Sequence, residues 1–476
     1  MDVSPLLLSR VQFGFTIAFH IIFPAFTIGL AAWLAYLEAC SLILDRPVYR
    51  RLFDFWLRIF AIAFGLGVVS GIVMAFQFGT NWSELSRRTG PIQGPLLGYE
   101  SFTAFALEAS FFGVLMFGRK LVPRLFYFFA CLMVCLGTSL SAFWILVNNT
   151  WMQVPTGFTT TADGLFVPTD WNAIIFNSVV WVRFPHMILA AYVTTAFCVA
   201  ATGAWHTLRG NTKVESRAML RMGLALACVL VPVQLVVGHL VGDYVVKYQP
   251  SKIAAIEGRW HSQQPAGEVI IGWPSEAQGR NLFELALPPP FGSLIDSSDT
   301  TSKEVGLDNF APSDRPPVLI PFFGFRIMVG CGLLMLGLAW GGMLYYVLGR
   351  LEHARWLLWG IFSSFPLGFI ATLLGWYTAE VGRQPWTVFG QLRTVDAVTP
   401  FLTTPQVTAS LAIFGTVYAL IFIAGVIYIY RLLKAGIQPM PEHTLAGSNP
   451  KRPFSVPGSS PGVAQAVGPV PAEAGE

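Results

Sequence analysis

The sequence predicts an all-α polytopic membrane protein with about nine transmembrane helices, its N-terminus outside and its C-terminus in the cytoplasm. Of its 476 residues, 54% are hydrophobic and only 12% are charged. Soluble domains carry about 25% charged residues, so water is not the main solvent of this chain. The mean hydropathy is +0.59. Apolar runs of about 20 residues, the length that crosses a bilayer core, recur throughout.

The first apolar run, 12–38, is too long for the core of a cleavable signal, and no small-residue cleavage site follows it. We therefore expect it to remain as a span. No internal repeat is recognisable, which disfavours transporter folds built from inverted halves. The eight spans predicted after it cover residues 53–77, 96–118, 125–147, 177–205, 219–241, 321–348, 355–378 and 407–432.

Positive charge in alternate connections orients these spans. Cytoplasmic loops carry an excess of Lys and Arg, whereas residues 151–170 carry none. The signal repeats in five connections, so the N-terminus is expected outside. The residues concerned are Arg46, Arg50, Arg51, Arg119, Lys120, Arg124, Arg209, Lys213, Arg217, Arg350, Arg355, Arg431 and Lys434.

Two segments are not expected in the membrane. Residues 243–317 form a long polar connection on the outer side, and loops of this length commonly carry function. Residues 439–476, rich in Pro, Gly, Ala and Ser, are expected to be a disordered cytoplasmic tail. The membrane domain is thus expected within residues 1–438, with 243–317 as an outer loop.

The six cysteines lie in or beside apolar runs and form no CxxC pair, so neither a disulfide framework nor a zinc site is expected. A CxxCH motif is also missing from the sequence, so any haem would be held without covalent attachment. No basic stretch alternates with aromatic residues, and no nucleic-acid partner is expected.

A few polar or ionisable residues fall inside the predicted spans, where such groups are costly and tend to mark function. Counted from the expected ends of the helices, most lie in one layer near the outer face. Met328 is added to this set because of the residues that lie close to it in the sequence. The others are His20, Glu100, Glu108, Arg183, His186, Arg326, Glu380 and Arg383.

Haem iron is the group that uses imidazole, thioether and carboxylate in an apolar layer. A His with a Met makes a six-coordinate electron-transfer haem, and a single ligand leaves iron open for oxygen. Arg183 and Arg326 lie just outward of His186 and Met328, which suits haem propionates. Each residue alone is more often ordinary packing; the shared depth is what favours haem over a packing role.

Five local strings resemble subunit I of the cytochrome bd-type quinol oxidases, in its short outer-loop, cyanide-insensitive group. GWYTAEVGRQPW (375–386) is the most specific of them. The matches extend from His20 to Trp386 and cover most of the chain except the tail and part of the outer loop. The other strings are FQFGTNW (76–82), SAFWILVNNTWMQ (141–153), KIAAIEGRW (252–260) and FRIMVGCG (325–332).

This resemblance implies ligands for three haems. His186 and Met328 match the pair on a low-spin haem b, and His20 and Glu380 match the axial ligands of two high-spin haems. Which of the two serves which haem stays open, and the oxygen-site haem is either haem d or a further haem b. The haem-adjacent residues implied are Arg183, Arg326, Arg383 and Trp376.

The resemblance also implies candidate catalytic residues. Lys252 and Glu257 in the outer loop match residues for quinol binding and oxidation. Glu100 matches an acid beside the high-spin haems. Glu108, with Ser141 and Asn149, matches a polar route for protons from the cytoplasm. Two residues depart from the family pattern. Ala75 stands where many relatives carry an acid, and Ala109 stands where some relatives carry a serine.

The expected function is that of a terminal oxidase in the bacterial inner membrane, which oxidises quinol, reduces oxygen to water and separates charge without pumping. A second membrane subunit is expected, and a small single-helix subunit is a further candidate partner. Two rivals are a cytochrome b-type quinone reductase, which usually pairs His ligands on the same helices, and a haem-free secondary transporter or ion channel with the buried acids as its ion path.

Overall fold

The computed structural model describes residues 4–211 and 213–437. Within these residues, nine helical segments are long and apolar enough to cross a membrane, which confirms the predicted all-α polytopic fold and its number of spans. The predicted tail, 439–476, lies outside the described residues.

In the described residues, the spans are formed by ten longer helices, two short ones (α6 and α12) and a π-helical turn. Their bounds, in chain order, are α1 (Pro5–Leu44), α2 (Pro47–Thr80), α3 (Ser83–Tyr99), the π turn (Glu100–Phe105), α4 (Ala106–Phe117), α5 (Arg124–Gln153), α6 (Trp171–Ile175), α7 (Val180–Leu208), α8 (Val214–Tyr248), α11 (Leu319–Val347), α12 (Arg355–Ser363), α13 (Leu367–Val381) and α14 (Thr404–Ala435).

The connections at one end of the helices carry the remaining structure, and we call this end the loop end. Its three two-stranded sheets are all antiparallel hairpins. The elements are α9 (Pro250–Glu257), α10 (Phe291–Ser297), β1 (Phe158–Thr160), β2 (Phe166–Pro168), β3 (Glu268–Ser275), β4 (Arg280–Leu287), β5 (Trp386–Val388) and β6 (Leu392–Arg393).

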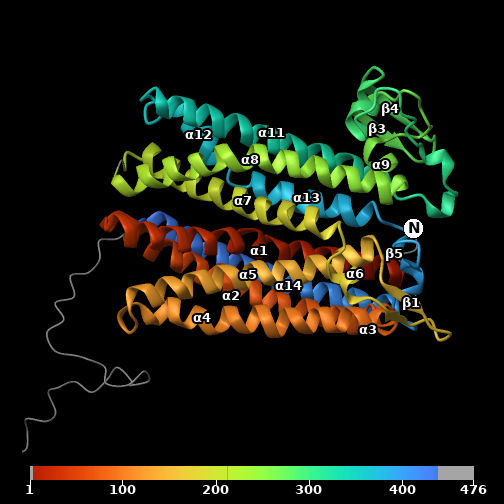
Figure 1. The fold of residues 1–476 in the computed structure, drawn as a ribbon, viewed down its shortest axis with the longest axis horizontal. Helices are drawn as coiled ribbons and strands as arrows, with labels where there is room; N and C mark the ends of the chain where they lie inside the picture. Colours follow the sequence, from red (N-terminus) through yellow and green to blue (C-terminus); the bar gives the residue numbers. More distant parts are fainter. Residues whose placement is uncertain (1–3, 212, 438–476) are drawn as a thin grey trace, which may run out of the picture. The chain divides into compact units, whose positions relative to one another are not determined.

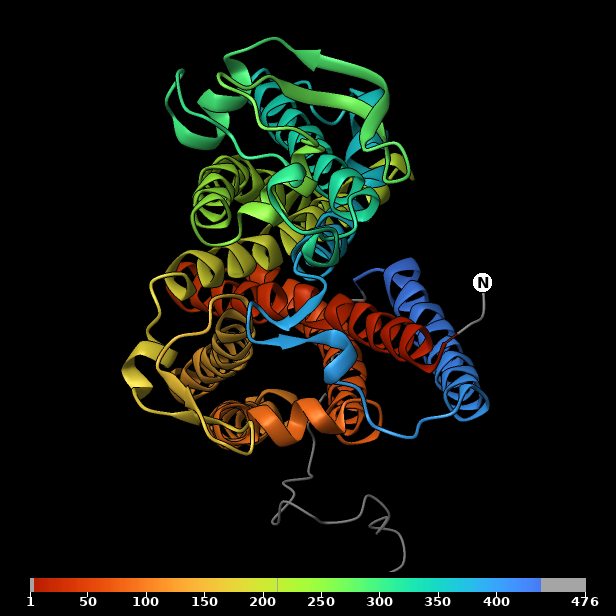
Figure 2. The same cartoon turned by 90° about the vertical axis from the view of Figure 1, so that its right-hand side faces the viewer.

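The helices form two neighbouring bundles (Figure 1). In the first, α7 packs on α8, α8 on α11, α11 on α13, and α13 on α7. In the second, α1 packs on α2 and α5, α4 packs on α5, and Phe112 of α4 contacts Phe60 and Phe64 of α2. The helix α1 also packs on α7 and so joins the two bundles, while α14 lies against α1 and α2 (Figure 2).

Helix α1 is central because its apolar residues are covered on several sides. Leu30, Leu34 and Leu37 are fully buried, in a cluster that includes residues of α2, α5 and α7. Away from the loop end the same cluster surrounds an ion pair, in which Arg119 Nη2 lies 2.7 Å from Glu38 Oε2 and the guanidinium stacks on Phe53 and Tyr127. Aromatic rings and two carboxylates, Glu38 and Asp54, thus stabilise a half-buried cation.

Two predicted boundaries are corrected. The outer loop begins after Tyr248 rather than at residue 243, because Tyr244 and Val245 continue the helix and pack on Ile253 and Ile256. The third span begins at Ser83 rather than at residue 96. Pro91 and Pro95 do not end this helix, since Ile92 and Leu96 are buried in a cluster with Trp151.

Two spans depart from a regular helix next to predicted site residues. The third contains the π turn, which begins at Glu100. The eighth is interrupted between Ser363 and Leu367, where Pro366 precedes α13. Local π-helical turns are frequent at functional sites because the extra residue re-aims the side chains around it.

Candidate redox site

His186 lies in the first bundle, one turn past Arg183 in α7. Its neighbour on α8 is Gly238, where an added Cβ would come within 3.2 Å of the imidazole Cε1. Gln234 Nε2 is 3.5 Å from His186 Nε2, the limit of a hydrogen bond. Among the described residues, no group bonds the buried Nδ1. The ring therefore retains a nitrogen for another partner.

Met328 lies on α11, which is diagonal to α7 in the first bundle. Its neighbour on α13 is Gly375, where an added Cβ would come within 2.8 Å of the Met328 sulfur. Only glycine leaves room for the thioether at this point. The pair His186 and Met328 thus comes from two helices that face each other across the four-helix bundle.

His20 lies in the second bundle. Its Nδ1 is 3.0 Å from Ser70 Oγ on α2, and the Ser70 hydroxyl also lies within hydrogen-bond distance of the Leu66 and Gly67 carbonyls. Gly71 follows Ser70, and an added Cβ there would come within 3.1 Å of the His20 ring. This contact fixes the orientation of the imidazole and leaves its Nε2 for a further ligand.

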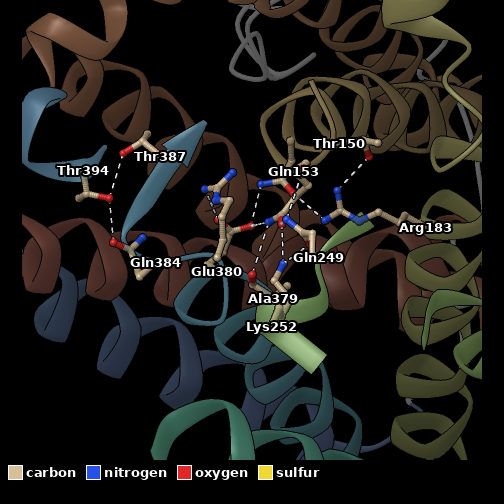
Figure 3. A network of polar contacts seen from close by, with 12 residues as sticks. Thr150, Gln153, Arg183, Gln249, Lys252, Ala379, Glu380, Gln384, Thr387 and Thr394 are labelled. Atoms are coloured by element: carbon tan, nitrogen blue, oxygen red, sulfur yellow. Dashed lines mark hydrogen bonds and ion pairs between the residues drawn. The ribbon is translucent and has the colours of Figure 1, made fainter. Parts of the chain in front are cut away.

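Glu380 joins the two bundles at the loop end (Figure 3). Its Oε1 accepts hydrogen bonds from Asn149 Nδ2 at 2.9 Å and from Gln153 Nε2 at 3.0 Å, both on α5. Its Oε2 is paired with Arg383. The Nε and Nη1 of Arg383 are buried, and no acceptor reaches them among residues 4–211 and 213–437.

Arg183 is held on the same face of α5. It donates from Nη2 to Asn149 Oδ1 at 2.6 Å and from Nη1 to Thr150 Oγ1 at 2.9 Å (Figure 3). Trp376 is half-buried on α13, one residue after Gly375, and its ring packs against Tyr377. Two cations are therefore close to Glu380: Arg383 pairs with it directly, and Arg183 is connected to it through Asn149.

The buried acids form a column along α5 rather than one thin layer. Glu380 contacts Asn149, Glu100 accepts from Ser141 Oγ at 2.8 Å, and the Glu108 side chain lies against Gly137. At a rise of 1.5 Å per residue, twelve residues of helix span about 18 Å. The predicted shared depth is thus wrong for Glu100 and Glu108, because their helix begins at Ser83.

The predicted polar route for protons, through Glu108, Ser141 and Asn149, is not continuous. Ser141 bonds Glu100 and not Glu108, while Asn149 bonds Glu380 and Arg183. Glu108 is 6% exposed, and no donor in the described part of the chain reaches its Oε1. Glu100 is only half-buried, and Ser101, which follows it, is exposed.

In the outer loop, Lys252 and Glu257 lie five residues apart on α9 and are both buried. Lys252 donates to Gln153 Oε1 and to Gln249 Oε1, each at 2.6 Å (Figure 3). Burial lowers the pKa of Lys252 well below its usual range, with the Glu380 carboxylate opposing the shift. Gln153 therefore connects Lys252 to Glu380.

Arg326 points toward the outer loop. It donates from Nη1 to the Ile256 carbonyl at 2.6 Å and from Nε to the Val269 carbonyl at 3.1 Å. Its Nη2 lies 3.6 Å from Glu257 Oε2 and 3.5 Å from Glu268 Oε1. The guanidinium thus ties α11 to the loop.

Sequence reasoning missed Gln153, Ser70 and Glu268. Gln153 closes the string 141–153, which offered a signal, whereas nothing in sequence distinguishes Ser70 from an ordinary helical serine. Glu268 lies in a short polar stretch, and only the fold brings it to Arg326.

The residues present fit haem. His186 and His20 each keep a ring nitrogen that no described hydrogen bond uses, three glycines make room beside His20, His186 and Met328, and Arg383 has unused donors for a carboxylate. Among the described residues, no cluster of three or more His, Cys, Asp or Glu side chains could hold a bare metal ion. Haem, which brings its own four ring nitrogens, needs only one or two protein ligands.

Fold and site together define a class: a polytopic membrane protein of the cytochrome type, with candidate haem ligands on separate helices. A family model for cytochrome bd terminal oxidase subunit I matches residues 8–437, and the chain belongs to that family. It is therefore a subunit of a respiratory oxidoreductase that contains haem. The haem-free transporter or channel is not supported.

Individual relatives support the same family assignment. The chain is 33% identical to cytochrome bd ubiquinol oxidase subunit 1 of Bacillus subtilis strain 168, covering 95% of this chain and 98% of the relative. It is 32% identical to cytochrome bd-II ubiquinol oxidase subunit 1 of Escherichia coli K12, covering 91% and 97%. A solved bd oxidase from Geobacillus thermodenitrificans superimposes with a TM-score of 0.83 at 28% identity, covering 91% and 99%. The predicted family and enzyme class are confirmed.

Proposed function

We propose that this chain oxidises quinol at the loop end and reduces oxygen to water within the helices, in the bacterial cytoplasmic membrane. The loop end faces outward, so the N-terminus is outside. A second membrane subunit, with or without a small single-helix subunit, completes the enzyme. The observation that carries the proposal is the pair of His186 and Met328, which face each other from diagonal helices beside Gly238 and Gly375.

His186 and Met328 hold a low-spin haem b in this proposal. His20 and Glu380 hold two high-spin haems, one of them haem b and the other haem d or a further haem b. Haem, when bound, supplies one-electron transfer and an iron at which oxygen is reduced. Arg383 offers Nε and Nη1 to a propionate, Arg183 adds positive charge, and Trp376 lies between the ligand-bearing residues.

Quinol binds beneath the outer loop, where Lys252 and Glu257 take its hydroxyl groups. Glu257 accepts a proton at Oε2 and passes it outward. Lys252 is held by Gln153 and Gln249, so its ammonium is positioned by α5 as well as by its own loop. Arg326 holds Glu257 in place from α11.

Protons for water formation come from the cytoplasmic side. Glu108, in the first turn of α4, takes them up, and Glu100, held by Ser141, delivers them toward the loop end. Because quinol protons leave outward and these enter from inside, charge is separated without a pump. Charge separation requires only that the electrons from quinol and the protons for oxygen reduction come from opposite sides of the membrane.

Replacing Met328 with Leu tests the ligand assignment. In the complete enzyme, Met328→Leu removes or shifts the low-spin haem band in reduced-minus-oxidised spectra and leaves the high-spin bands in place. The matched control is Met335→Leu, because Met335 lies two turns further along α11 and is buried among apolar residues. Chromatography of the extracted pigments identifies the haems.

Two outcomes would contradict the proposal. An unchanged low-spin band in the Met328→Leu enzyme would show that Met328 is not a ligand. Purified enzyme without haem bands would remove the redox function itself.

A further inference from the structure

The outer loop buries a second carboxyl group against Glu257. Glu257 is the last residue of α9 and Glu268 is the first of β3, and an oxygen of each carboxylate lies within 3.6 Å of the same atom, Arg326 Nη2. Glu257 is 4% and Glu268 7% exposed. The mechanism above uses Glu257 alone, so Glu268 is a buried titratable group without an assigned role.

Among the described residues, Arg326 is the guanidinium that lies within 4 Å of both carboxylates. Arg326 Nη2 lies 3.5 Å from Glu268 Oε1 and 3.6 Å from Glu257 Oε2, and its other nitrogens are engaged by loop carbonyls. Within the described residues, no donor lies in hydrogen-bond range of the two buried Oε2 atoms. Two ionised carboxylates here would exceed the available positive charge by one, and a proton held between them supplies the missing donor.

We propose that Glu268 shares one proton with Glu257 and is the group from which protons leave outward during quinol oxidation. This inference rests on the proposed role of Glu257. In each of two transfers, one O–H bond of the quinol breaks, one electron leaves to the electron acceptor of the proposed oxidase reaction, and the proton joins Glu257. The pair then carries two protons, and the O–H bond of Glu268 breaks to release one to outer water.

The surrounding charges agree with a shared proton. Burial, and then the neighbouring Glu257 carboxylate, raise the pKa of Glu268 well above its usual range, while Arg326 and Asp296 act in opposite directions. Asp296 is itself paired with Arg259 at 2.8 Å. Beyond it, Glu304 accepts from the hydroxyls of Ser297 and Ser302. These acids lead from Glu257 toward α10.

A purely structural role for Glu268 is the alternative, in which it only anchors the β3–β4 hairpin to Arg326. The two roles differ in pH dependence, because an anchor affects the rate equally at every pH. A proton-releasing group changes the pH profile of quinol oxidation and leaves later electron transfer unchanged.

The test uses the complete oxidase with Glu268→Gln, which keeps the shape but cannot release a proton. The control is Glu284→Gln, an exposed glutamate on β4 of the same hairpin. Oxygen uptake with quinol is measured across pH, together with haem spectra and oxygen uptake driven by an artificial electron donor that bypasses the quinol. Glu268→Gln should slow quinol oxidation by about tenfold or more and change its pH profile, since a positioned acid–base group contributes at least this much.

Identical pH profiles for Glu268→Gln and Glu284→Gln would overturn the inference. If Glu268→Gln enzyme does not accumulate, Glu268→Asp replaces it: the shorter carboxyl should shift the pH profile, and a profile that stays unshifted likewise overturns the inference. The failure of the proposed function looks different, since the unmutated enzyme would then take up oxygen with the artificial donor but not with quinol.

Discussion

Glycine residues determine where the proposed haem ligands can lie. Gly71, Gly238 and Gly375 each face one of His20, His186 and Met328 from a neighbouring helix, at distances that leave no room for an unmoved Cβ beside Met328 and little beside the two imidazoles. A ligand must be held within a few tenths of an ångström to bind iron well. We infer that these glycines set ligand position rather than backbone conformation, since all three are in regular helices.

Gly375→Ala should disturb the low-spin haem without unfolding the protein. The new methyl group displaces the Met328 sulfur, and overpacking of this kind costs about 1–3 kcal/mol. We expect a shifted or weakened low-spin band and a changed reduction potential in the complete enzyme, measured by redox titration.

The control for this substitution is Gly337→Ala on α11, where nothing lies within 4 Å of an added Cβ. There the helix should gain about 0.5–1 kcal/mol, since alanine replaces glycine in a helix interior. Equal spectra and potentials in the two variants would contradict the positioning role.

At the scale of elements, the outer loop is unusual in how it buries charge. Residues 249–318 bury the side chains of Arg259, Asp296, Glu257 and Glu268. A loop near solvent does not need to bury charged groups in order to remain soluble. Buried ion pairs contribute little net stability, because desolvation offsets attraction. Their presence here is consistent with proton transfer, and it makes the loop sensitive to pH.

We expect the stability of the loop to fall as the pH rises. Burial and the Glu257 carboxylate raise the pKa of Glu268, and burial with Glu257 raises that of Asp296 to about 6. At these two carboxyl groups the folded loop therefore binds more protons than the unfolded loop above the ordinary carboxyl pKa, whereas the lowered pKa of Lys252 acts in the opposite direction. Each pH unit in this window costs up to about 1.4 kcal/mol per proton. Protease cleavage of the loop, normalised to cleavage of denatured oxidase, should accelerate with pH.

Glu268→Gln should flatten this dependence, because the amide needs no proton when buried. Glu284→Gln serves again as the control and should cleave like the unmutated enzyme. Cleavage rates that rise equally in all three would contradict the assignment.

In the molecule as a whole, two helical bundles meet at Glu380. The first carries His186 and Met328, and the second carries His20, Glu100 and Glu108. Glu380 belongs to α13 of the first bundle yet accepts hydrogen bonds from Asn149 and Gln153 on α5 of the second. Gln153 also reaches Lys252, so a single network of side chains connects the outer loop to both bundles.

The proposed orientation can be tested with two cysteines. Thr300→Cys is exposed in the outer loop, and His353→Cys is exposed in the connection between α11 and α12. In intact cells, a maleimide that cannot cross membranes should label Thr300→Cys, whereas His353→Cys should react only after permeabilisation. The unmutated chain, with its cysteines inside the spans, gives the background. Reversed labelling would invert the proposed topology and the direction of proton release.

The sequence by itself determined the class of fold, the number of spans and the family. Hydrophobic runs of bilayer length are local properties, and so are strings such as residues 375–386. His20, His186, Met328 and Glu380 could be named from sequence because ionisable or ligating side chains are costly in a membrane unless they have a partner.

The tertiary structure alone decided which of these residues meet. It extended the third span back to Ser83, which placed Glu100 and Glu108 deeper than expected, and it joined Ser141 to Glu100 rather than to Glu108. It also brought Glu268 to Glu257 and Gln153 to Lys252 and Glu380. Such contacts depend on packing between helices far apart in the chain, and a one-turn shift of one helix would remove them without changing any local pattern.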